Sequence, residues 1–162
     1  MAAGLSLEES QIEPLRAALN ANTVLTKEDI IPKVSIDIVL PLGYINEEMI
    51  EELEKLEPFG KGNSKPIFAE RNLKIIKGNV IGKNSNVLKM KVCNEFGRIM
   101  EALYFGDITQ FQSYVSEKFS PMDFSNMLAG RPNDINLSVI YYPSINEYGG
   151  NRTTQIIIQS YQ

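Results

Sequence analysis

The 162-residue sequence contains no histidine and a single cysteine, Cys93. Without histidine, the chain can form neither a Ser-His or Cys-His nucleophile pair nor a histidine-containing metal site, although oxygen ligands alone can hold Mg²⁺. One cysteine excludes an internal disulfide framework and fits a reducing cytoplasm, which is the location we expect. We therefore expect no catalytic residue, no metal ligand and no cofactor in this chain.

Long hydrophobic runs are also missing. No run approaches the roughly 18 apolar residues of a membrane span, so we expect no membrane contact. The opening MAAGLSLEESQIE has neither the charged nor the apolar region of a signal peptide. The hydrophobic content of 43% is nevertheless enough for a real core, and the length predicts one domain plus a smaller piece.

Charge is distributed unevenly along the chain. Residues 1–68 hold six Lys/Arg against twelve Asp/Glu, whereas residues 69–162 hold ten against eight. Local charge decides what a surface attracts, so the most basic window predicts where a polyanion would bind. Within residues 71–98, Glu95 is the only acidic residue beside seven basic ones: Arg71, Lys74, Lys77, Lys83, Lys89, Lys91 and Arg98.

The first part of the chain has helical spacing around one short strand. Residues 10–20 predict a helix that begins with the capping box Ser10-Gln-Ile-Glu13. Residues 33–40 alternate as a strand does, and residues 46–57 predict an amphipathic helix with an asparagine N-cap. The many glutamates of this second helix indicate a solvated face more than a metal site.

From residue 71 onward the pattern alternates with period two. A bulge is expected at Lys77-Gly78, and Leu88, Met90 and Val92 should share one face. The predicted strands are 71–82, 87–93, 98–106, 134–142 and 153–161, with a helical region at about 107–129. Five strands with a helical insert between the third and fourth predict a mainly β fold with α elements, namely a five-stranded OB-fold barrel preceded by a helix and a strand-helix connector.

An OB-fold leaves the outer face of its second and third strands, and its first and fourth loops, free for ligands. Those that bind single strands combine Lys/Arg with aromatic rings on which bases stack. The alternative is that the lysines only keep a strand edge soluble. In the pairs Tyr104-Phe105 and Tyr141-Tyr142, one ring should point inward. The candidate nucleic-acid-binding residues are Lys74, Lys77, Lys83, Lys89, Lys91, Arg98, Tyr104, Tyr148 and Arg152.

The stretch EPFGKGNSKPIF (57–68) concentrates residues with constrained or unusual backbone preferences. Its spacing is not that of a phosphate-binding P-loop, and it lies between a helix and a strand instead of the reverse. We therefore interpret it as a stiff connector that leads from the helix into the barrel. Its structural residues are Pro58, Phe59, Gly60, Gly62, Asn63 and Phe68.

LEPFGKGNSKPIF strongly resembles the L-E-P-F-G-x-G-N-P-x-P-x-F junction of the RecJ family of single-strand-specific exonucleases, with Ser64 in place of the usual proline. MAAGLS resembles the end of the G-G-H-x-x-A-A-G motif of that family's DHHA1 domain, so the first residue matches an interior family position. KVSIDIVLPLGYI and INEYGGNRTTQIIIQSY also resemble family segments. The resemblance covers essentially the whole chain.

This resemblance implies three parts: residues 1–32 as the C-terminal remnant of a DHHA1 domain, 33–68 as the connector, and 69–162 as the OB-fold domain. It also implies that hydrolysis belongs to an N-terminal DHH domain, absent here, whose Asp and His residues hold Mn²⁺ or Mg²⁺. The expected partners are single-stranded DNA and these missing domains. The expected role is DNA binding for a monomeric 5′→3′ exonuclease of DNA repair and recombination.

A second interpretation is that the OB-fold serves as a scaffold or protein-docking module while DNA binds elsewhere in the parent protein. The acidic first part of the chain favours this view because it would repel DNA. Salt dependence distinguishes the two, since phosphate contacts weaken steeply with added salt and apolar docking does not.

Overall fold

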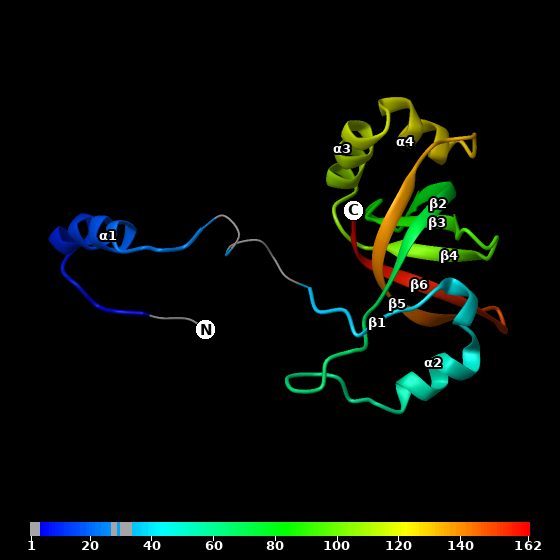
Figure 1. Cartoon of the computed structure of the whole chain (residues 1–162), viewed down its shortest axis with the longest axis horizontal. Coiled ribbons are helices and arrows are strands. Elements are labelled where there is room, and N and C mark those ends of the chain that lie inside the picture. Colours follow the sequence, from blue (N-terminus) through cyan, green and yellow to red (C-terminus); the bar gives the residue numbers. More distant parts are fainter. Residues whose placement is uncertain (1–3, 27–28, 30–33) are drawn as a thin grey trace. The chain divides into compact units, whose positions relative to one another are not determined.

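The computed structural model describes residues 4–26, 29 and 34–162 (Figure 1). The chain divides between Val34 and Ser35 into two units, which are described separately. Met1, Ala2 and Ala3, three of the residues that resemble the DHHA1 motif, and Lys33 at the expected start of the first strand lie outside the described residues.

The first unit holds a 3₁₀ turn, η1 (Glu9–Gln11), followed by helix α1 (Ile12–Ala21). The expected capping box is wrong: the N-cap position is Gln11, which makes no side-chain cap hydrogen bond. Capping needs an extended backbone at the N-cap, but Gln11 has φ −91° and ψ −8°. Ser10 itself lies within η1, one residue before the N-cap position of α1, so it does not occupy the capping position.

The second unit begins with the connector. It contains strand β1 (Ile38–Val39), a 3₁₀ turn η2 (Leu42–Tyr44) and helix α2 (Glu47–Glu54). The strand expected over 33–40 is thus reduced to two paired residues before Pro41, which cannot donate to a ladder. The asparagine N-cap of α2 is confirmed, because Asn46 Oδ1 accepts from the Met49 backbone N–H at 2.8 Å.

Five longer strands form the rest of the sheet: β2 (Phe68–Ile81), β3 (Val87–Cys93), β4 (Ile99–Tyr104), β5 (Asn136–Tyr148) and β6 (Asn151–Tyr161). The order is β1-β2-β3-β4-β6-β5, and β5 also pairs with β2, so the five strands close into a ring. Neighbours in the ring are antiparallel except β4 and β6, which are parallel. This is the strand order of an OB-fold, with β1 added beside β2.

Helices α3 (Ile108–Lys118) and α4 (Pro121–Leu128) connect β4 to β5, as the helical region of the sequence predicted. Asp107 caps α3 and Ser120 caps α4, each by accepting backbone N–H groups of the first turn. Figure 1 shows both helices at one end of the strand ring and α2 at the other. Phe111 and Met127 reach from them into the core.

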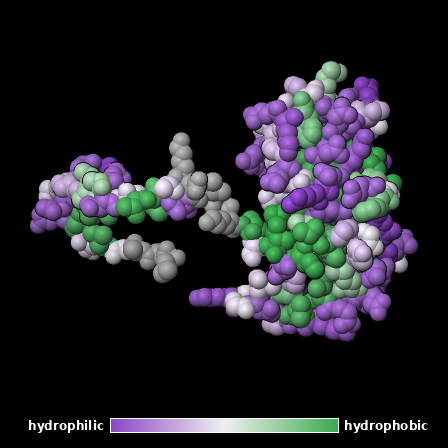
Figure 2. Space-filling model, in the orientation of Figure 1, coloured by the Kyte–Doolittle hydropathy of each residue, from purple (hydrophilic) through white to green (hydrophobic). Residues whose placement is uncertain are grey.

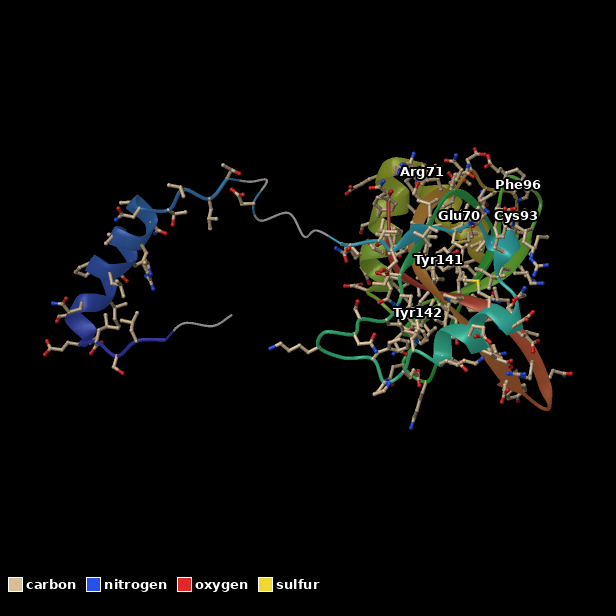
Figure 3. All side chains as sticks on the ribbon, turned by 60° about the horizontal axis from the view of Figure 1, so that its bottom comes forward. Glu70, Arg71, Cys93, Phe96, Tyr141 and Tyr142 are labelled. Carbon is tan, nitrogen blue, oxygen red and sulfur yellow. The ribbon has the colours of Figure 1, made fainter. Side chains whose placement is uncertain are left out.

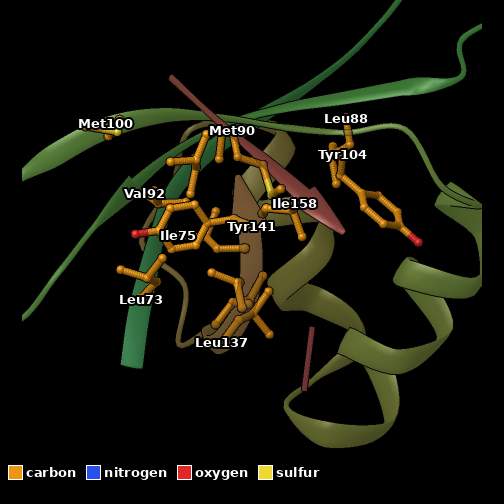
Figure 4. Packing of buried hydrophobic residues seen from close by; sticks show 14 of the residues in the cluster. Leu73, Ile75, Leu88, Met90, Val92, Met100, Tyr104, Leu137, Tyr141 and Ile158 are labelled. Carbon is orange, nitrogen blue, oxygen red and sulfur yellow. The ribbon is translucent and has the colours of Figure 1, made fainter. Parts of the chain in front are cut away.

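The core fills the inside of the ring (Figure 4). The alternation of β3 is confirmed, since Leu88, Met90 and Val92 are buried. Tyr141 from β5 is also fully buried, and its hydroxyl donates to the Leu40 carbonyl oxygen. This bond satisfies the one polar atom of a ring that otherwise lies among apolar side chains. It also fastens the connector to the ring.

Two irregularities shape β2. The register with β3 shifts between Ile75 and Lys77, slightly before the Lys77-Gly78 position predicted for the bulge. The register with β5 shifts between Glu70 and Leu73. Asn72 lies in this second irregularity with φ +57°, a left-handed conformation that asparagine tolerates better than most residues.

The last two strands are longer than predicted. They continue into NEYGGN, so that only Gly149 and Gly150 remain as the turn, with φ +58° and +80°. A two-residue hairpin turn with positive φ at both positions favours glycine, which explains why the turn can be so short.

A candidate nucleic-acid interface on strands β2, β3 and β4

The outward side chains of β2, β3 and β4 form regular rows. One row joins Lys77, Lys91 and Glu101, because Lys77 pairs with Lys91 and Lys91 with Glu101. The rows on either side are Lys74-Cys93-Ile99 and Asn79-Lys89-Leu103. We call the four lysines of these rows, Lys74, Lys77, Lys89 and Lys91, the basic face. Four of the lysines predicted from the sequence thus lie on one surface.

A shallow groove crosses this surface, lined by Lys77, Asn79, Lys89, Lys91 and Glu101. Glu101 lies within it, and its Oε2 is 2.8 Å from Lys89 Nζ. Both side chains are roughly one-third exposed, so the pair is partly shielded from solvent. Glu101 falls just beyond the window counted in the sequence, and it neutralises one of the four charges of the basic face.

The other predicted basic residues lie near the two ends of the basic face or away from it. Lys83 is exposed in the turn between β2 and β3, at one end of β3. Arg98 is exposed at the opposite end, immediately before β4, and its backbone N–H donates to Asn94 Oδ1 at 2.9 Å. Lys83 and Arg98 therefore extend the basic face lengthwise.

Tyr104 is wrong as a base-stacking residue. It is only 7% exposed, and its ring centroid lies 5.7 Å from that of Phe111 and 5.4 Å from that of Tyr161. The reason is the alternation of β4, which turns Met100, Ala102 and Tyr104 inward. The neighbouring Phe105 is the ring that faces solvent.

Tyr148 is 84% exposed, as expected for the tip of the last hairpin. Arg152, proposed from the sequence to take a phosphate, is surrounded by carboxylates instead. Its guanidinium nitrogens lie 2.7 Å from Glu147, 2.9 Å from Glu51 and 3.3 Å from Glu47. Arg152 therefore ties the β5–β6 hairpin to helix α2, and its charge is already balanced.

The loop over residues 57–68 is held mainly by its own hydrogen bonds. Gly60 and Asn63 exchange backbone bonds at 2.8 and 3.1 Å, and Asn63 Nδ2 donates to the carbonyl oxygens of Leu56 and Pro58. Gly62, between them, has φ +89°, a conformation that favours glycine. The backbone N–H groups of Gly60 and Asn63 are thus already engaged within the loop.

Two aromatic residues anchor that loop. Phe68 is buried with its centroid 6.1 Å from that of Tyr141. Phe59 is half-buried, and Lys65 Nζ lies 5.7 Å from its centroid and 4.1 Å from that of Tyr142. The loop runs from the end of α2 to the start of β2, and its role as a stiff connector stays a prediction.

Sequence reasoning missed Phe96, which is 78% exposed on the turn between β3 and β4 (Figure 3). The sequence predicted only a tight turn at residues 94–97. The signal was present in part, because asparagine at the first position of a turn commonly bonds its own backbone two residues ahead. Such a turn presents the intervening side chains outward, and one of them here is aromatic.

A buried hydrogen-bond chain supports this turn. Asn94 Oδ1 accepts from the backbone N–H groups of Phe96 and Arg98, and Asn94 Nδ2 donates to Glu70 Oε1 at 3.1 Å. Glu70 Oε2 accepts from the Leu42 N–H at 2.8 Å. Burial raises the pKa of Glu70, while the bonds from Leu42 and Asn94 oppose that rise. Nothing in the sequence marked Glu70 as an interior residue.

The described part of the chain brings together no group of three or more His, Cys, Asp or Glu side chains that could hold a metal ion. Among the described residues, no helix is both long and apolar enough to cross a membrane.

The strand order and pairing define an OB-fold domain. The family model described as the RecJ OB domain matches residues 36–160, and the chain belongs to that family. A curated relative is the single-stranded-DNA-specific exonuclease RecJ of Bacillus subtilis (strain 168), which is 37% identical over 101 residues, or 61% of this chain.

Two crystal structures of RecJ from Thermus thermophilus show the same fold. The complex with Mg²⁺ aligns over 97% of this chain with a TM-score of 0.63 and 17% identity. The complex with Mn²⁺ aligns over 97% of this chain with a TM-score of 0.60 and 16% identity. The chain spans only 13% of the Bacillus relative and 21% and 20% of the Thermus chains, so it corresponds to a small part of those proteins.

Proposed function

We propose that this chain is the single-stranded-DNA-binding OB-fold portion of a RecJ-like 5′→3′ exonuclease of DNA repair and recombination. The observation that carries the proposal is the cross-strand placement of Lys77 and Lys91 beside Lys74 and Lys89 on the face of an OB-fold that is open to ligands. The name of the Bacillus relative, a single-stranded-DNA-specific exonuclease, supports the substrate class.

Lysines arranged in rows neutralise successive phosphates, which gives affinity without sequence preference. The surface between them is not purely polar, since Ile99 is exposed and Leu103 partly exposed on β4. Such side chains can lie against sugars and bases once a strand is bound. Hydrolysis would be carried out by the missing DHH domain with its Mn²⁺ or Mg²⁺, and the OB-fold would hold the strand for it. In this proposal the chain works as a monomer, in the cytoplasm, joined to those domains.

The rival proposal is a protein-docking module, and one surface favours it. Ile36, Ile38 and Val39 are all exposed around β1. Figure 2 shows apolar side chains gathered on the larger unit in that region. An apolar patch of this kind is typical of a contact with another protein surface.

The test is fluorescence anisotropy of a labelled single-stranded oligonucleotide at low and moderate salt, with duplex DNA as a control. The variant Lys77→Gln/Lys91→Gln should lower the affinity about tenfold and reduce the slope of log affinity against log salt by roughly 1.4, since each phosphate contact contributes about 0.7.

The matched control is Lys61→Gln/Arg131→Gln, which removes two exposed charges far from the basic face in sequence and has no side-chain bond to break among the described residues. It should bind almost as the parent chain does. No binding at low salt, or equal losses in the two double variants, would overturn the proposal and favour protein docking.

A further inference from the structure

Phe96 lies at the end of the basic face. The row nearest to it joins Lys74 to Cys93, and the turn that carries Phe96 follows Cys93 directly. Arg98, exposed on the far side of the same turn, places a positive charge two residues from the ring. A single strand that followed β3 across the lysines would leave the sheet at the turn that carries Phe96.

The turn holds the backbone of Phe96 in a fixed place. Asn94 and Arg98 are joined by a backbone bond of 3.1 Å, and the Gly97 N–H donates to the Asn94 carbonyl oxygen at 3.0 Å. Gly97 has φ +79°, which favours glycine at that position. Asn94 is itself only 5% exposed. A ring on such a turn can contact a ligand without the entropic cost of ordering a flexible loop.

The support continues into the connector. Glu70 accepts from Asn94 on one oxygen and from the Leu42 N–H on the other. Glu70, Asn94 and Leu42 are all buried, and Figure 3 shows Glu70, Cys93 and Phe96 in the same region of the larger unit. The position of the turn is therefore linked, through two side chains, to the segment that precedes α2.

Tyr148, the other highly exposed ring, has a different setting. It follows Glu147, and the nearby Arg152 is bound by three carboxylates. Glu95 is the acidic residue beside Phe96, but Arg98 and Lys74 lie at the same end of the basic face. The charge around Phe96 thus suits a polyanion better than the charge around Tyr148.

We propose that Phe96 is a stacking platform for an unpaired base of DNA bound along the basic face, and that Asn94 and Glu70 are the residues that position it. This inference rests on the proposed function and adds to it a contact with a base, where the lysines contact phosphates. Aromatic rings are suited to the role because every base has a π-face, so stacking adds affinity with little sequence preference.

The test compares a normal single-stranded oligonucleotide with an abasic strand of equal length and charge. Phe96→Ala should weaken binding of the normal strand about tenfold, within the range that removal of one stacked base allows. It should leave binding of the abasic strand unchanged, and Phe96→Tyr should bind as the parent chain does. Tyr148→Ala, which removes an exposed ring whose neighbour Arg152 is bound by three carboxylates, is the matched control and should have little effect on either strand.

The positioning residues are tested by exchanging their chemistry. Asn94→Asp alone places two carboxylates together, and Glu70→Gln alone places two amide donors together, so each should weaken binding of the normal strand. The double variant Glu70→Gln/Asn94→Asp restores a donor and an acceptor at the two ends of the bond and should recover the affinity. If Asn94 and Glu70 act by positioning Phe96, the double variant should recover no affinity when Phe96 is also replaced by alanine. If their role is merely structural, the double variant should recover affinity whether or not Phe96 is present.

The outcomes separate this inference from the function on which it rests. If the parent chain does not bind single-stranded DNA at low salt, both proposals fail. If it binds and Lys77→Gln/Lys91→Gln weakens binding, but Phe96→Ala binds like the parent or loses equally on the abasic strand, only the stacking proposal is overturned.

Discussion

Arg152 on β6 donates a hydrogen bond of 2.9 Å to Glu51 on α2, across 101 residues of sequence. The same guanidinium also contacts Glu47 and Glu147. An arginine with three carboxylates has little charge left for a phosphate, although the sequence alone places it in a hairpin well suited to bind one. Its observed contacts join the connector helix to the last hairpin.

Replacing Arg152 should therefore change DNA binding very little. We expect Arg152→Gln to alter the affinity for a single-stranded oligonucleotide by less than about twofold, well below the effect of a lysine that contacts a phosphate. Anisotropy at low salt measures this directly. The reciprocal variant Glu47→Gln/Glu51→Gln should raise affinity, because it removes two of the three carboxylates that balance the guanidinium. A large loss with Arg152→Gln would show instead that the arginine leaves its carboxylates when DNA binds.

Glu101 limits the charge of the basic face. Glu101→Gln should release Lys89 and raise the affinity for single-stranded DNA about threefold, with the salt slope steeper by roughly 0.7 if one more phosphate is neutralised. The measurement is a salt titration of oligonucleotide binding. Glu117→Gln on α3 removes the same charge from an exposed position elsewhere and is the control. If both variants gained the same affinity for DNA, the change in net charge would explain the gain, and release of Lys89 would not.

Glu70 should make stability depend on pH. Burial raises its pKa above the ordinary value of 4.5, so the folded chain keeps the proton to higher pH than the unfolded chain does. This contribution to the free energy of unfolding is therefore present at acidic pH and declines as the pH rises through and above 4.5. Urea unfolding should show that, as the pH rises from 4 to 7, the free energy of unfolding of the parent chain falls relative to that of Glu70→Gln.

Glu70→Gln carries a second, pH-independent effect. Its amide group would face the amide of Asn94, leaving a buried donor without an acceptor at a cost of about 1–3 kcal/mol. The two effects are separable. The unpaired amide donor sets a constant offset between the two profiles of unfolding free energy against pH, and the raised pKa sets the difference in their slopes. Parallel profiles would contradict the raised pKa.

Gly106 borders the packed ring of Tyr104. A Cβ atom at this position would lie 2.2 Å from Tyr104 Oη and 2.3 Å from Cζ. The ring cannot easily move, because Phe111 and Tyr161 pack against it. Gly106→Ala should lower the free energy of unfolding by about 1–3 kcal/mol, as overpacking does elsewhere. Gly43→Ala, whose Cβ would meet nothing within 4 Å, is the control and should be close to neutral in urea unfolding.

The strand order and the helical insert could be predicted because the apolar period changes from helical to alternating where the connector ends. Lys89 and Lys91 could be placed on the outward face of β3 because Leu88, Met90 and Val92 fix which side of β3 is inward. These are local properties, and a single sequence carries them. Lys74 and Lys77 join these two lysines through the register shift between Ile75 and Lys77.

The errors come from contacts between distant segments. Tyr104 was misplaced because a strand predicted over 98–106 leaves the inward face open to either of two adjacent rings, and only packing against Tyr161 decides it. The ion pairs of Arg152 and Lys89 depend on which strands and helices become neighbours. The capping box failed because a preceding turn altered the backbone at the N-terminus of α1.

Among the described strands, β2 is the one that pairs with three others: β1, β3 and β5. It changes its partner along its length, meeting β5 mainly through its first half and β3 through its second. Both strand pairings that close the ring at β2 therefore depend on the two halves of one continuous strand. Loss of pairing in β2 would open the ring on two sides at once and separate Lys77 from Lys91. The basic face and the closed ring should therefore unfold together as one cooperative unit. Amide hydrogen exchange would detect this as a common opening of β2, β3 and β5.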